Sequence, residues 1–348
     1  MSSNVLQEKH ASDSKPVSFS EIPVIDLTNV KNPDLGLRQA LAKEIRDACV
    51  NVGFFYVKNH EIPTNIINEA LEATKEFFSL PLESKMEIEN KKSPNFRGYA
   101  PLLSGNNNPD NAGDLHEGFQ FGWEELVDDK GARGEDIDGP MSGANTWPSK
   151  LEAPNFREAI LKYYHAAVHL GRLLFPIFAL ALELPKDYFE DKTKHSAAIM
   201  GLLHYPPQTG HVDDRVIGIG AHTDWECFTI LWQQPGIQAL QVLNADNIWV
   251  NAPPIDGTLV INLGDQFARW TNDVFKSTVH RAINRSGVRR YSIPLFFGTD
   301  YNVKLEAIPS CVSETRPAKY DVVTAGEYVK SRFQATYGNY STMASADH

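Results

Sequence analysis

Two histidines and one aspartate in the second half of the chain have the types and spacing of a metal site. Asp224 lies two residues after His222, so on an extended strand both side chains project from the same face. His280 lies in a later segment, residues 276–283, whose β-branched residues predict another strand. If the two strands face each other, two imidazoles and one carboxylate bind one side of an iron(II) ion and leave three positions open.

An HxD pair alone occurs in many proteins, and a lone later histidine is often an ordinary buried or surface residue. Arg290 and Ser292 strengthen the interpretation because they follow His280 and share one face of a predicted strand. The guanidinium offers a rigid fork for a carboxylate, and the hydroxyl adds a donor. A metal site beside a carboxylate clamp fits a 2-oxoacid cosubstrate, whose oxoacid end chelates the metal while the clamp holds its far carboxylate.

Further motifs occur in one order along the chain. In the first half these are Ile-Pro-Val-Ile-Asp-Leu (22–27), Val-Gly-Phe-Phe-Tyr-Val-Lys-Asn-His (52–60), Phe-Phe-Ser-Leu-Pro (77–81), Arg-Gly-Tyr (97–99), His-Glu-Gly-Phe (116–119) and Asn-Thr-Trp-Pro (145–148). In the second half, Tyr-Pro-Pro (205–207) and Asn-Leu-Gly-Asp (262–265) accompany the metal and clamp residues. With these motifs the chain resembles the iron(II)/2-oxoglutarate-dependent dioxygenases of the isopenicillin N synthase-like type, from about residue 22 to about residue 300.

The resemblance implies a set of cofactors and residue roles. Iron(II), 2-oxoglutarate and dioxygen are the implied cofactor and cosubstrates, with ascorbate as an activator. Succinate and carbon dioxide are the implied coproducts. The hydroxyl of Tyr205 matches a position that helps to hold the far carboxylate of the cosubstrate. In several plant members an asparagine two residues earlier also contacts the cosubstrate, but here that position is Leu203, so the contact is absent or replaced.

The elements that must position these residues are short strands and longer helices. From about residue 198 onward, short apolar runs alternate with turn signals such as Pro235-Gly236 and Asp256-Gly257, a pattern typical of a jelly roll. Apolar residues at helical spacing predict helices over residues 34–51, 63–78 and 156–184. Pro176 should kink or split the last of these. The expected fold is mostly β with flanking α: a double-stranded β-helix core with an α-helical support layer.

The domain organisation follows from these elements. Residues 1–20 are polar and predict a flexible leader. The other expected segments are an N-terminal dioxygenase region with a long pocket loop (21–150), a support helix (151–196), the jelly-roll catalytic core (197–300) and a C-terminal segment that closes the pocket (301–348).

Composition excludes several other classes of protein. The net charge of −11 argues against a nucleic-acid partner, which needs a basic face. Three widely spaced cysteines form neither a disulfide framework nor a zinc cluster, which fits a reducing compartment. No long run of apolar residues predicts a membrane span, and the start of the chain lacks the apolar core of a secretory signal. These features predict a cytoplasmic protein whose partner is a small molecule; they leave its oligomeric state open.

Aromatic residues near the predicted barrel mouth are candidates for substrate binding. Individually each is as well explained as a core residue, but together they favour a small, mainly apolar or aromatic metabolite. The candidates are Phe96, Tyr99, Phe119, Phe121, Trp225, Phe228, Phe296 and Phe333.

Three functions remain open from the sequence. The first is a 2-oxoglutarate-dependent oxygenase that hydroxylates, desaturates or cyclises a metabolite, with secondary metabolism as the setting that the resemblance favours. The second is an iron oxidase that uses dioxygen without 2-oxoglutarate, in which Arg290 and Ser292 bind the substrate instead. The third is a non-catalytic jelly roll that binds a small molecule.

Overall fold

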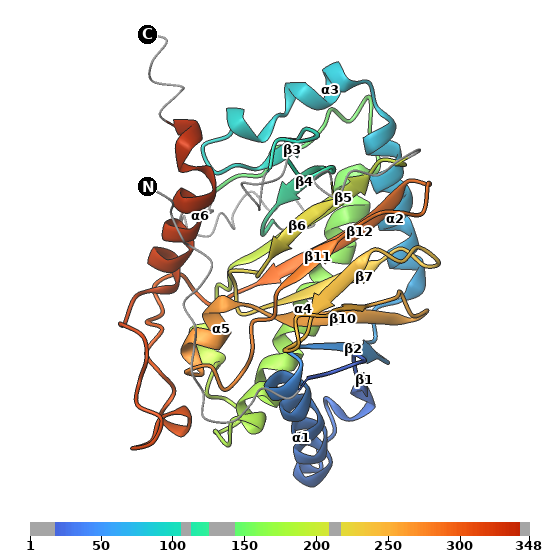
Figure 1. Ribbon diagram of the computed structural model, residues 1–348. Helices are drawn as coiled ribbons and strands as arrows, with labels where there is room; N and C mark the ends of the chain where they lie inside the picture. Colours follow the sequence, from blue (N-terminus) through green and yellow to red (C-terminus); the bar gives the residue numbers. More distant parts are fainter. Residues whose placement is uncertain (1–17, 106–112, 125–142, 209–216, 342–348) are drawn as a thin grey trace.

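The computed structural model describes residues 18–105, 113–124, 143–208 and 217–341, with the backbone alone for residues 336–341 (Figure 1). The predicted leader therefore lies almost wholly outside the described residues, as do two parts of the predicted pocket loop.

Strands of the described residues form two sheets that face each other. The larger sheet has the order β1 (Val24–Asp26), β2 (Phe54–Lys58), β10 (Thr258–Leu263), β7 (Phe228–Gln233), β12 (Arg290–Phe297), β5 (Ala198–Tyr205), β4 (Glu117–Phe121) and β3 (Gly98–Ala100). The smaller sheet has the order β6 (Ile219–His222), β11 (His280–Ala282), β8 (Leu240–Leu243) and β9 (Trp249–Asn251). Apolar side chains of β2 and β10 pack against those of β8 between the sheets.

Helices cover the outer face of the larger sheet (Figure 1). They are α1 (Leu35–Asn51), α2 (Thr64–Ser79) and α4 (Phe156–Ala181), and α4 contacts both of the others as well as β12. The remaining helical segments are α3 (Leu82–Glu87), α5 (Asp265–Trp270), α6 (Ala325–Ser341) and four short 3-10 turns, η1 (Leu27–Asn29), η2 (Asn90–Lys92), η3 (Glu190–Lys192) and η4 (Pro309–Cys311). This jelly-roll core with a helical layer is the fold that the sequence predicts.

Strand alternation decides which side chains reach the space between the sheets. On β12, Tyr291 and Phe297 face the helices: Tyr291 contacts Phe78, and Phe297 contacts Phe175. Arg290, Ser292 and Phe296 must then lie on the opposite, inner face, because successive residues of a strand point to opposite sides. The clamp residues and the metal residues therefore share one interior.

The long helix α4 decides between the two effects expected of Pro176 only as far as a split is concerned. It continues through Pro176 as a single element, so the predicted split does not occur. Its buried side lies close against the larger sheet. A Cβ at position 171 would come within 2.8 Å of the ring of Phe297, so the close contact requires a glycine there. By length and composition α4 could also cross a membrane, but 61% of that window is buried within the fold, as in the core helix of a globular protein.

The C-terminal helix α6 lies beside α5 (Figure 1). A capping box begins it, in which the backbone N–H of Glu327 donates to Thr324 Oγ1 (3.1 Å) and the backbone N–H of Thr324 donates to Glu327 Oε2 (2.7 Å). Its Phe333 ring contacts that of Phe96 at 4.6 Å between centroids. The last helix thus contacts the N-terminal half of the chain.

Candidate metal centre and cosubstrate site

The register of the smaller sheet brings the two histidines together. β6 ends at His222 and β11 begins at His280, and these two residues are direct partners across the antiparallel pair. Asp224 follows two residues after His222 and places Oδ1 3.6 Å from Nε2 of each histidine. One donor atom from each of the three side chains lies within 4.8 Å of the others. The three side chains therefore offer three metal-ligand atoms around one point and leave the other side of that point open.

Hydrogen bonds orient the imidazole rings of His222 and His280. Nδ1 of His222 lies 2.7 Å from the carbonyl oxygen of Gly220, and Nδ1 of His280 lies 3.1 Å from that of Thr278. A carbonyl only accepts, so each Nδ1 carries the proton and each Nε2 keeps a lone pair for a metal.

The carboxylate of Asp224 is fixed from the larger sheet. Its Oδ2 accepts hydrogen bonds from Thr229 Oγ1 on β7 and from Asn262 Nδ2 on β10, the latter at 2.7 Å. These bonds leave Oδ1 directed at the two imidazoles. The sheet that does not carry the histidines thereby orients the third donor.

The protonation states suit a cation. Burial alone would raise the pKa of Asp224, but the adjacent His280 and His222 and the hydrogen bonds from Thr229 and Asn262 outweigh it and hold the pKa below its usual value. Burial, together with the neighbouring His222, lowers the pKa of His280 to about 4, so its imidazole is neutral at neutral pH. Two imidazole nitrogens and one carboxylate, with one side open, fit iron(II).

The clamp lies at the start of β12. Arg290 is the Cα partner of Tyr205 on β5, is only 1% exposed, and holds its guanidinium carbon 4.8 Å from the centre of the tyrosine ring. Its Nη2 donates to Gln233 Oε1 at 3.4 Å, while Ser292 Oγ donates to the Tyr205 hydroxyl at 3.4 Å. Within the described residues, Nε and Nη1 of Arg290 have no hydrogen-bond partner. A buried cation with two free donors fits a carboxylate, such as the far end of 2-oxoglutarate.

Known families match both halves of the chain. A family described as non-haem dioxygenase in morphine synthesis N-terminal matches residues 22–150, and the 2OG-Fe(II) oxygenase superfamily matches residues 196–299. The chain belongs to the 2-oxoglutarate- and iron(II)-dependent oxygenases. The oxidoreductase class, iron(II), 2-oxoglutarate and dioxygen that the sequence predicts are thereby confirmed; ascorbate as an activator stays a prediction.

Relatives of this oxygenase resemble it over nearly their whole length. The 2-oxoglutarate-Fe(II) type oxidoreductase ppzC of Metarhizium majus is 37% identical over 325 residues, which cover 90% of this chain and 87% of that protein. The 2-oxoglutarate-dependent dioxygenase traH of Penicillium crustosum is 35% identical and covers 91% and 94%. A full-length protein of Neurospora crassa, solved in complex with alpha-KG, has a TM-score of 0.79 at 28% identity, covering 91% of this chain and 96% of that one.

Four of the aromatic candidates lie away from the space between the sheets. Tyr99, Phe119 and Phe121 pack with the helical layer: Phe119 contacts Phe77 of α2 and Phe156 of α4. Phe228 likewise contacts Phe175 and Phe178 of α4. All four are buried on the outer face of the larger sheet, which corrects the expectation that they line the substrate pocket. A sheet that is covered on both faces needs large apolar side chains on both, so ring content alone could not distinguish them.

The other four candidates remain near the barrel interior. Phe296 lies on the inner face of β12 and is partly exposed, and Trp225 is a partly buried neighbour of Asp224. Phe96 and Phe333 contact each other, and Phe333 packs against Ile199, an inner-face residue of β5.

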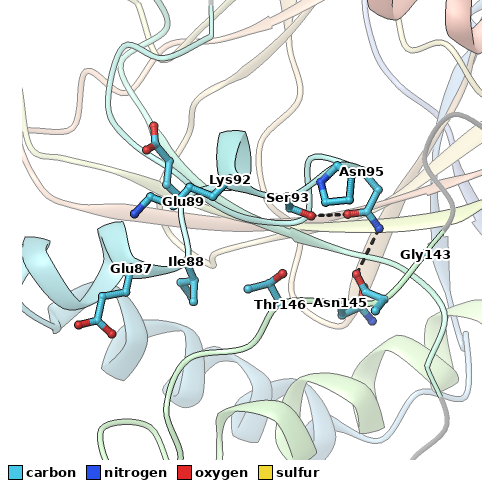
Figure 2. Close-up of a pocket in the computed structure, with 11 residues that line it drawn as sticks. Glu87, Ile88, Glu89, Lys92, Ser93, Asn95, Gly143, Asn145 and Thr146 are labelled. Atoms are coloured by element: carbon cyan, nitrogen blue, oxygen red, sulfur yellow. Dashed lines mark hydrogen bonds between the residues drawn. The ribbon is translucent and has the colours of Figure 1, made fainter. Parts of the chain in front are cut away.

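A surface cleft of about 380 Å³ lies elsewhere, between residues 87–95 and residues 143–146 (Figure 2). Asn95 crosses it and donates from Nδ2 to the carbonyl oxygen of Ala144 at 3.2 Å. None of the metal or clamp residues lines this cleft. We therefore assign the chemistry to the interior between the sheets, where donors of matched geometry converge.

Some residues of the site were missed by sequence reasoning. Thr229, Gln233 and Asn262 orient Asp224 or Arg290, and each is a polar residue at an inner position of an otherwise apolar strand. A polar residue within an otherwise apolar strand was the sequence signal that could have identified them. Glu226, two residues after Asp224, is also buried, and burial raises the pKa of its carboxyl to about 8.

The role of Asn262 is testable. Asn262→Ala should weaken metal binding or turnover by about 10–100-fold, because removing a residue that orients a metal ligand has effects of this size. Titration of the apoprotein with iron(II) or cobalt(II) measures the change in affinity. Asn251→Ala, at an exposed position on β9, provides the control. Equal affinities in the two variants would show that the hydrogen bond to Asp224 does not matter for the metal.

Proposed function

We propose that His222, Asp224 and His280 hold the iron(II) ion of this oxygenase. We further propose that Arg290, with Ser292 and Tyr205, binds the far carboxylate of 2-oxoglutarate. The substrate is a small, mainly apolar or aromatic metabolite that enters beside Phe296, and the oxygenase hydroxylates, desaturates or cyclises it. A cytoplasmic location and a setting in secondary metabolism belong to the same proposal; relatives from fungi such as traH support the latter.

The buried guanidinium of Arg290 carries this proposal. A cation that is 1% exposed and keeps two free donors is costly unless an anion joins it. A dicarboxylate that reaches from the metal to Arg290 would bind the metal with one carboxylate and pair with the guanidinium through the other. The iron oxidase that uses no 2-oxoglutarate would need the substrate itself to supply that carboxylate.

The chain's own residues perform positioning and exclusion of water. When bound, the iron supplies the oxidative chemistry, in which dioxygen, 2-oxoglutarate and substrate yield succinate, carbon dioxide and oxidised product. His222, Asp224 and His280 leave one side of the ion open to the cosubstrates. Arg290 fixes the direction of 2-oxoglutarate, and the apolar surround of Phe296 holds the substrate beside the metal in a site with little water.

A small-molecule substrate is supported by a structural neighbour. The full-length Neurospora crassa protein has also been solved with alpha-KG and thymine together, at a TM-score of 0.78 to this chain. Its ring-shaped ligand supports a planar or cyclic metabolite here as well.

Turnover of the cosubstrate tests the proposed function. Purified enzyme with iron(II) and 2-oxoglutarate should consume dioxygen and release succinate slowly without substrate, and faster when a metabolite panel contains a substrate. Release of succinate in proportion to product supports the proposal. Product formed at full rate without 2-oxoglutarate would assign the protein to the oxidase class, and no dioxygen consumption under any condition would favour a binding protein.

A further inference from the structure

Glu226 is a buried carboxyl group that neither the metal site nor the clamp uses. The residue is 6% exposed, and its Oε2 accepts a hydrogen bond from Gln266 Nε2 at 3.0 Å. Among the described residues, no lysine, arginine or histidine forms an ion pair with it. A buried carboxyl without a cation destabilises the fold, so its presence calls for another explanation.

Gly298 locates this carboxyl on the inner face of the larger sheet. The residue follows β12, and continued alternation places it in the same inner row as Arg290, Ser292 and Phe296. A Cβ at position 298 would overlap Glu226 Oε2. The carboxyl of Glu226 therefore fills the space that a side chain of the inner row would otherwise occupy.

The same row relates Glu226 to the metal centre. Phe296 is the Cα partner of Thr229, and the hydroxyl of Thr229 donates to Asp224. Among the inner residues of β12, Phe296 therefore lies level with the metal residues. Gly298 lies two residues further, about 7 Å along an extended chain. Arg290 begins the row on the other side of Phe296. The interior thus has a cation at one end, the metal donors in the middle and a carboxyl at the other end.

Glu226 lies near one apolar cluster, which it approaches at Ala197 and Tyr301. A small cluster of Ala197, Ile199, Tyr301 and Val329 lies there, with Phe333 packed against it. Ala197 also approaches Gly298, and the charge of Glu226 raises the pKa of the Tyr301 hydroxyl further above the value that burial sets. A polar acceptor in an apolar wall is the usual construction of a specificity contact in a small-molecule site.

We propose that Glu226 determines substrate specificity by binding a protonated amine of the substrate. The proposal rests on the proposed function, because it places the substrate's apolar body beside Phe296 and Phe333. Glu226 then holds the polar end on the side of the metal opposite to Arg290. The ligand then supplies the cation that the described residues around Glu226 lack.

Three probes that share a phenylethyl group and differ in their end group test this inference by binding. They are 2-phenylethylamine, 2-phenylethanol and 3-phenylpropionate, which end in a cation, a neutral hydroxyl and an anion. Calorimetry without oxygen on enzyme loaded with iron(II) and 2-oxoglutarate should give the tightest binding for the amine, at least about tenfold tighter than for the carboxylate, as one charge-assisted bond provides. Glu226→Gln should bring the three affinities to within about threefold, because the amide has the same shape without the charge.

Two further variants distinguish an effect on the preference for the amine from a general effect on the structure. Gly298→Ala should also remove the preference for the amine, since the added methyl group displaces the carboxyl without deleting it. Glu190→Gln changes an exposed glutamate and should leave the preference unchanged. The affinity of each variant for 2-oxoglutarate should equal that of the wild type.

Two outcomes would overturn the inference. One is a wild-type enzyme that binds the three probes equally, prefers the carboxylate, or fails to bind the amine. The other is a Glu226→Gln variant that keeps the wild-type order. Either result with normal 2-oxoglutarate binding concerns Glu226 alone, whereas loss of 2-oxoglutarate dependence in the wild type would refute the proposed function.

Discussion

His280→Ala should lower succinate formation to less than about 1% of wild type, because it removes one of three ligands from an open metal site. The same loss is expected for His222→Ala and Asp224→Ala. Asp224→Glu should fail as well, since an added methylene moves the carboxylate by more than the ~0.2 Å tolerance of a metal bond. Succinate release gives the activity, and metal analysis of the purified variants gives the iron content.

The fold should persist in these variants, because alanine keeps the backbone groups through which His280 pairs with His222 and Val242. Circular dichroism checks this. His169→Ala, at an exposed position of α4, is the matched control and should keep full activity. Near-wild-type activity of His280→Ala at ordinary iron concentrations would contradict the ligand assignment.

Arg290→Ala should raise the apparent KM for 2-oxoglutarate by at least about tenfold, since a charge-assisted hydrogen bond of roughly 1.5–3 kcal/mol is lost and each 1.4 kcal/mol is one decade. The true loss should exceed this minimum, because the carboxylate would be left unpaired in a buried site. Arg290→Lys should recover only part of the affinity, because an ammonium group cannot reproduce the two-pronged geometry.

Steady-state kinetics with varied 2-oxoglutarate measures this change. Arg289→Ala removes the preceding arginine, which is exposed, and should leave KM unchanged. If Arg290→Ala instead raised KM for the substrate and left 2-oxoglutarate unaffected, the guanidinium would belong to the substrate site.

The sequence could single out the candidate metal residues because part of their signal is local. Two residues at i and i+2 share a face of a strand, which brought His222 and Asp224 together in the prediction; β6 ends at His222, and Asp224 follows it outside the strand with Oδ1 3.6 Å from Nε2 of His222. That His280 faces His222 could not be derived from local sequence. It follows from the register of β11 against β6. Helix α1 was also predictable in its bounds, since Asp34 caps it and its apolar positions recur at helical spacing.

The substrate pocket could not be predicted in the same way. β7 reads Phe-Thr-Ile-Leu-Trp-Gln, and its polar residues Thr229 and Gln233 distinguish the two faces, but the pattern does not say that the apolar face packs against helices rather than lining a pocket. The placement of Phe228 against α4 follows only from the assembled helical layer. Glu226 gave no signal either, because its burial depends on Gly298, which lies far along the chain.

The two sheets contribute differently to the metal centre, and this has a thermodynamic consequence. His222 and His280 come from the smaller sheet, while Asp224 is held by Thr229 and Asn262 of the larger one. An ion bound to all three is a cross-link between the sheets that exists only in the folded chain. Metal binding and folding are therefore linked equilibria, and a free iron concentration of 100 times Kd adds about 2.7 kcal/mol to the free energy of unfolding. Iron supply would then set the lifetime of the protein as well as its activity.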